Sequence, residues 1–133
     1  MISAENFLDH SSELYAQENK SEILLRNVAR NSYYALYHKL LEIDTGVELN
    51  KSKREFGAHE LLIQHLRKCD NECFRELGLR LSQLKAIRNK ADYKLDQHFS
   101  DYDARKALKV VEKILRETEI EQASNQLSVL AQT

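Results

Sequence analysis

Arg88 occupies the position at which the surrounding pattern most clearly calls for a different residue type. An apolar stripe at helical spacing precedes it, formed by Phe74, Leu77, Leu81 and Leu84. The next step of four residues along this stripe reaches Arg88. Because burial of an unpaired charge is unfavourable, an inward guanidinium must pair with a carboxylate or hold an anionic ligand. The first alternative is a structural ion pair with Asp92, one helical turn further on. The second is an anion-binding site.

A second group of polar and aromatic side chains lies on the long helix expected from Glu22 to Ile43. One face of this helix carries Leu25, Ala29, Leu36, Leu40 and Ile43, and an adjacent face carries Arg30, Tyr34, Tyr37, His38 and Leu41. A helix with two faces turned from solvent lies at the centre of a bundle or at a subunit interface. Hydroxyl and imidazole groups suit a polar pocket. The alternative is that Tyr33, Tyr34 and Tyr37 are core aromatics and that His38 is a hydrogen-bonded structural histidine.

Other candidate residues lie in the middle of the chain. His59, which follows Gly57 and Ala58 near the start of a helix, either faces an anion or is an exposed polar residue. Two basic clusters could attract a phosphate backbone, and they consist of Lys51, Lys53 and Arg54 in a loop and of Lys85, Arg88, Lys90 and Lys94. His65, Cys69 and Cys73 have the spacing of soft metal ligands on one helical face, but a fourth ligand is missing, so we expect no metal.

Composition predicts one all-α domain. The 133 residues include no proline and three glycines, which leaves few breakers for a many-stranded sheet with tight turns. The formal net charge of -1 gives no general attraction to polyanions, so any nucleic-acid binding requires a local basic patch. No signal segment and no long apolar run is found, and the two cysteines are too close in sequence to bridge comfortably within a helix. We therefore expect a cytoplasmic protein that does not span a membrane.

Five helices must position these residues. We expect them at about residues 4–17, 22–43, 56–67, 71–91 and 101–119, with residues 92–99 as a loop. Ser21, Asn71 or Asp70, and Ser100 with Asp103 are the expected N-terminal caps, and Gly46 is the expected cap after the second helix. Residues 1–120 form the bundle. Residues 121–133 are a polar tail that we expect to be disordered or to depend on a partner for order.

Three segments in this order resemble a HEPN domain: RNSYYALYH at 30–38, GAH at 57–59 and RNKADY at 88–93. The chain is most similar to short prokaryotic HEPN proteins with a tyrosine-rich second helix, over roughly residues 5–118. The resemblance implies an up-and-down helical bundle, commonly a homodimer, whose subunits face a shared cleft. Many HEPN proteins are metal-independent endoribonucleases of toxin–antitoxin or phage-defence modules, and they use no cofactor.

The resemblance also implies roles for individual residues. Arg88 matches the family's arginine and would bind phosphate, and Asn89 matches the polar residue that often follows it. The family's histidine, expected four to six residues after the arginine, is absent. Tyr93 lies within that window and would hydrogen-bond the scissile phosphate, whereas His98 lies too far along.

The missing histidine bears on catalysis. A tyrosine with an ordinary pKa near 10 is a poor base at neutral pH. Either His38 or His59 therefore moves the proton from another helix, or the domain binds RNA without cutting it or cuts it weakly. The expected cleft is lined by Arg30, Tyr34, His38, His59, Arg88, Asp92 and Tyr93, and Lys51, Lys53, Arg54 and Lys90 would steer the RNA backbone.

A second hypothesis places the chain in a different class of protein. It would be a non-catalytic interaction subunit whose motif residues form a buried structural network. Its surface or its leucine-bearing tail would then recruit a cognate antitoxin, a nucleotidyltransferase or another effector. The absent histidine and the near-neutral charge favour this alternative.

Overall fold

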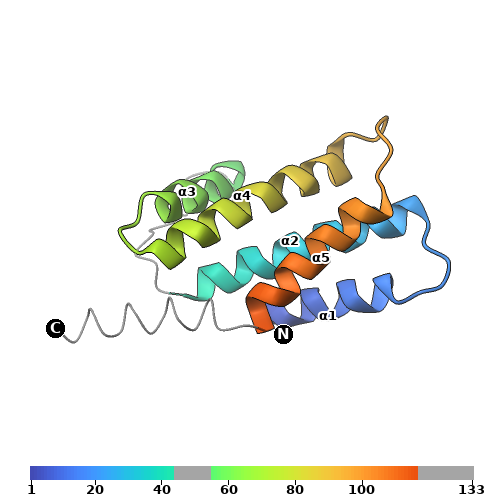
Figure 1. The fold of residues 1–133 in the computed structure, drawn as a ribbon, viewed down its shortest axis with the longest axis horizontal. Helices are drawn as coiled ribbons and strands as arrows, with labels where there is room; N and C mark the ends of the chain where they lie inside the picture. Colours follow the sequence, from blue (N-terminus) through green and yellow to red (C-terminus); the bar gives the residue numbers. More distant parts are fainter. Residues whose placement is uncertain (44–54, 117–133) are drawn as a thin grey trace.

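The computed structural model describes residues 1–43 and 55–116, and this part of the chain is helical without strands. Its helices are α1 (Ala4–Tyr15), α2 (Glu22–Glu42), α3 (Glu55–Arg67), α4 (Glu72–Tyr93) and α5 (Asp101–Arg116). α1 and α4 run in one direction and α2 and α5 in the opposite direction, with α3 packed against α4 (Figure 1). The predicted all-α bundle is confirmed.

Side-chain caps begin the helices where the sequence predicts them. The hydroxyl of Ser21 and Oδ1 of Asn71 each accept a hydrogen bond from the backbone N–H three residues further on. Before α5, Ser100 Oγ accepts a hydrogen bond from the N–H of Asp103, and the Asp103 carboxylate accepts one from the N–H of Ser100. These caps satisfy N–H groups that have no partner inside the helix.

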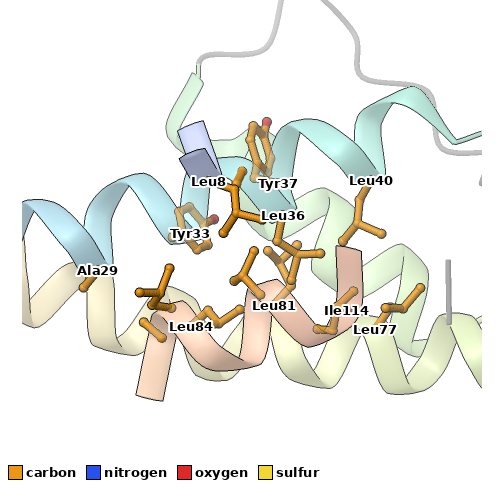
Figure 2. Close-up of a cluster of buried hydrophobic side chains, with 14 of the residues drawn as sticks. Leu8, Ala29, Tyr33, Leu36, Tyr37, Leu40, Leu77, Leu81, Leu84 and Ile114 are labelled. Carbon is orange, nitrogen blue, oxygen red and sulfur yellow. The ribbon is translucent and has the colours of Figure 1, made fainter. Parts of the chain in front are cut away.

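α2 lies at the centre of the bundle and packs against α1, α4 and α5. The core is built around it, with Tyr33, Leu36 and Leu40 of α2 facing leucines of α4 and Ile114 of α5 (Figure 2). The stripe predicted on α4 belongs to this core, because Phe74, Leu77, Leu81 and Leu84 are each 2 % exposed or less. Burial of each such side chain stabilises the fold by about 1.5–3 kcal/mol.

α3 and α4 approach each other closely at Gly78. A Cβ atom at this position would lie 2.8 Å from the Cβ of Leu66 and 3.1 Å from the backbone nitrogen of Arg67. A side chain does not fit at those distances, so the contact requires glycine. This close packing fixes α3 on α4 and so places His59, which lies two turns before Leu66.

Arg26 ties the end of α4 to α2, although nothing in the sequence analysis singled it out. Its side chain is 7 % exposed. Its Nη1 donates hydrogen bonds to the carbonyl oxygens of Lys90 and Ala91, and its Nη2 donates to those of Lys94 and Gln97. The last carbonyls of a helix have no partner within it, and this guanidinium supplies four donors to them and to the connection that follows.

The predicted ends of α1 and α4 each differ from the structure by two residues. α1 ends at Tyr15 rather than Gln17, and α4 continues past Ala91 to Tyr93 because the Arg26 guanidinium and the N–H of Lys94 bind its last carbonyls. The predicted cap Gly46 and the predicted tail at 121–133 lie outside the described residues. Within the described ranges, no helix combines the length and the apolar composition needed to cross a bilayer.

Candidate functional site

Arg88 lies on the inward side of α4, one turn beyond Leu84, and its side chain is 11 % exposed. Its Nη2 donates a hydrogen bond of 3.1 Å to the hydroxyl of Tyr34, and its Nη1 donates one of 3.0 Å to Oδ1 of Asn89. Its Nε is buried and has no hydrogen-bond partner in the described part of the chain. Neutral oxygens therefore hold the guanidinium in place while one donor remains unsatisfied.

Three tyrosine rings lie around this guanidinium. Its central carbon is 5.4 Å from the ring centres of Tyr33 and Tyr34 and 5.8 Å from that of Tyr93. These distances fall within the range of cation–π attraction. Tyr33 is fully buried, Tyr34 is half-buried and Tyr93 is 72 % exposed, so the group meets solvent on the side of Tyr93. We call Arg88, Tyr33, Tyr34, Asn89 and Tyr93 the Arg88 cluster.

Asp92 lies between two arginines at the edge of the cluster. Its Oδ2 is 3.5 Å from Nε of Arg88, and its Oδ1 is 3.8 Å from Nε of Arg30. The ion pair with Arg88 is the one that the structural alternative requires, and it coexists with the hydrogen bond from Arg88 to Tyr34. Arg30 stands on α2 with 52 % of its side chain exposed. Two guanidinium groups and one carboxylate thus leave one positive charge in excess.

His59 joins the cluster indirectly, through Tyr33. The Tyr33 hydroxyl lies 2.6 Å from Nδ1 of His59, and the imidazole stacks on the ring of Tyr37 at 4.0 Å between centroids. Burial, together with the nearby charges of Arg88 and Lys85, lowers the pKa of His59 to about 4. Burial also raises the pKa of Tyr33 above its ordinary value. Both groups are therefore neutral at pH 7, and the direction of the hydrogen bond between the hydroxyl and Nδ1 depends on the tautomer of the imidazole.

The fold is expected to lose stability as the pH falls from about 6.5 to about 4, because His59 must become protonated. Its pKa of about 4 in the folded chain is below the ordinary value of 6.5, so the proton binds the unfolded chain more tightly. Urea unfolding followed by circular dichroism across this range measures the loss. The loss should be smaller in His59→Phe, which places another aromatic ring at this position but takes up no proton. An equal loss in both proteins would contradict the prediction.

His38 lies one helical turn after Tyr34 on α2, and its side chain faces α1. Its ring stacks on Phe7 at 5.3 Å and on Tyr34 at 6.0 Å between centroids. It lines a pocket of about 400 Å³ together with Ile2, Ser3, Ala4, Phe7, Leu41 and Glu42. Among the described residues, no hydrogen bond, ion pair or ring contact joins His38 to Arg88. A proton-transfer role for His38 beside Arg88 has no direct contact to support it.

The remaining predicted residues do not join the cluster. The ammonium of Lys90 points to α5, where it pairs with Asp103 at 3.0 Å and lies 5.8 Å from the ring centre of Phe99. His98 is 83 % exposed and lies 3.5 Å from Glu22. The basic group of Lys51, Lys53 and Arg54 falls outside the described residues. Within those residues, no three histidine, cysteine or acidic side chains gather as metal ligands, and Cys69 donates to the carbonyl oxygen of His65.

Tyr33 links Arg88 to His59, a role that the sequence alone did not indicate. Its spacing with Ala29 and Leu36 marks it as a core residue, which is correct, but spacing does not report where a hydroxyl points. His59 lies 26 residues away, in a helix whose placement depends on Gly78.

The chain was compared with protein-family models, curated proteins and solved structures, and it matches none of them.

Proposed function

We propose that this chain binds RNA or a nucleotide at the Arg88 cluster. The observation that carries the proposal is the guanidinium of Arg88, whose side chain is 11 % exposed. Tyr34 and Asn89 hold its Nη atoms, and its Nε has no hydrogen bond although Asp92 lies 3.5 Å away. A phosphate oxygen is the acceptor that such a group binds best. The exposed ring of Tyr93 beside it offers a surface on which a base can stack.

Binding is better supported than cutting. Cleavage through the RNA 2′-hydroxyl needs a proton acceptor with a pKa near the working pH. His59 has a pKa of about 4 and its Nδ1 is engaged by Tyr33, while His38 makes no contact with Arg88. A metal-independent endoribonuclease of this geometry would therefore be slow.

The proposed setting is a toxin–antitoxin or phage-defence module, with the chain acting as a homodimer in the cytoplasm. This part rests on the resemblance of three sequence segments to HEPN domains and on the helical bundle that agrees with it. Size-exclusion chromatography with light scattering tests the dimer directly.

A second candidate function is that of a non-catalytic subunit that recruits a partner protein such as a nucleotidyltransferase. Large apolar side chains in and around the connection between α4 and α5 favour it. Tyr93, Leu95 and Tyr102 are 72 %, 74 % and 62 % exposed, as in surfaces that bind other proteins.

The direct test is to titrate a fluorescently labelled single-stranded RNA with the protein at low salt in EDTA. Arg88→Gln should weaken binding at least about tenfold, because it removes the charge that faces the phosphate. Arg80→Gln is the matched control, since Arg80 lies on the same helix but pairs with Glu76 away from the cluster, and it should change binding little.

The same samples run on a gel report cleavage. Binding that depends on Arg88 with intact RNA supports a binding protein, and products that disappear in Arg88→Gln support a ribonuclease. Absence of binding by the parent protein, with circular dichroism unchanged in the variants, overturns the proposal and leaves the recruiting subunit.

A further inference from the structure

We infer that Asp92 is a built-in counter-ion of the binding site, whose carboxylate lies where a phosphate group of the ligand binds between Arg88 and Arg30. The inference deepens the proposed function and rests on it. It gives Asp92 an inhibitory role in place of the structural ion pair that the sequence offers as an alternative. The ligand group is a phosphate with at least two free oxygens, as in an RNA backbone or a nucleotide.

The first support is the geometry of the two ion pairs. Each carboxylate oxygen of Asp92 faces a different arginine, on α4 for Arg88 and on α2 for Arg30, at 3.5 and 3.8 Å. Neither contact is a hydrogen bond, and Nε of Arg88 remains unsatisfied although a carboxylate lies beside it. Asp92 therefore offsets part of the positive charge of the two arginines without accepting a hydrogen bond from either of them.

The second support is a comparison with lysine pairs that join other helices. Lys39–Glu5, Lys85–Glu60 and Lys90–Asp103 are hydrogen-bonded at 2.7, 2.9 and 3.0 Å. Those distances are typical of charge-assisted hydrogen bonds that hold helices together. The pair between α2 and α4 through Asp92 is longer and contributes less to packing, so it can open at little cost.

The third support is that Arg88 does not need Asp92 for its position. Tyr34 and Asn89 already fix both of its Nη atoms. Asp92 is also the penultimate residue of α4, where its side chain can turn towards solvent. A phosphodiester carries the same charge as a carboxylate over two free oxygens, and it can take hydrogen bonds from both arginines in its place.

The test is RNA binding by Asp92→Asn, which keeps the shape of the side chain and removes its charge. The labelled single-stranded RNA should bind about fivefold more tightly than to the parent protein at low salt. Asp96→Asn removes the same charge from an exposed position in the connection after α4 and should change affinity much less. Competition by adenosine monophosphate or inorganic phosphate indicates a site for a terminal phosphate. RNA binding without such competition indicates a site for a backbone phosphate.

The outcomes separate the inference from the proposed function. Binding by the parent that becomes tighter in Asp92→Asn but not in Asp96→Asn supports the inference. Binding by the parent that is unchanged or weakened in Asp92→Asn overturns the inference alone. Binding by neither protein overturns both. Asp92→Ser, with thermal melting of each variant, guards against a loss of binding caused by misfolding.

Discussion

Replacing Arg26 with leucine is expected to lower the free energy of unfolding by about 3 kcal/mol. The guanidinium is 7 % exposed and donates to four backbone carbonyls at the end of α4 and in the connection after it. Leucine leaves these carbonyls without the donors that satisfy them. Because a domain of this size is stable by about 5–15 kcal/mol, the loss is large, and urea unfolding followed by circular dichroism measures it.

Arg30→Leu provides the matched control for this experiment. Arg30 lies one turn further along α2, but its side chain is 52 % exposed and its ion pair with Asp92 is long. A surface change of this kind alters stability by about 0.5 kcal/mol or less. Similar losses in the two variants would show that Arg26 does not hold the end of α4. Arg26→Lys should also be destabilising, since an ammonium cannot reach four carbonyls at once.

Arg26 and Arg88 each interrupt an apolar stripe at helical spacing, and only Arg88 was found from the sequence. Read backwards from Leu36 through Tyr33 and Ala29, the stripe on α2 reaches Arg26. The same pattern identified Arg88 beyond Leu84. The signal was therefore present in the sequence.

Other features of the site depend on contacts between distant segments. Helical periodicity predicted the bundle and the α4 stripe, since these follow from which face of a helix is apolar. The cleft expected from the resemblance placed Arg88 with Tyr34. The bond from Tyr33 to His59 depends instead on how α3 packs on α4. The predicted end of α4 was wrong because Arg26, 65 positions away in the chain, binds one of the last carbonyls of the helix.

The two arginines differ in how their donors are satisfied, and this difference separates a structural role from a binding role. Arg26 has backbone carbonyls at both Nη atoms. Arg88 has a hydroxyl, a side-chain amide and a buried Nε without a hydrogen bond. Removing Arg26 leaves four carbonyls without their donors. The partners of Arg88 keep other contacts, because the part-buried Tyr34 hydroxyl can bind water and Asp92 still faces Arg30.

Arg88→Leu is therefore expected to separate binding from stability. Leucine extends the stripe of Leu81 and Leu84, the part-buried Tyr34 hydroxyl can bind water, and Asp92 keeps its ion pair with Arg30. The free energy of unfolding should therefore change by about 1 kcal/mol or less. RNA affinity at low salt should fall by at least about tenfold, because the phosphate loses its buried cation. Urea unfolding and RNA titration of the same preparation measure both. A loss of stability as large as that of Arg26→Leu would mean that Arg88 and Asp92 form a structural ion pair.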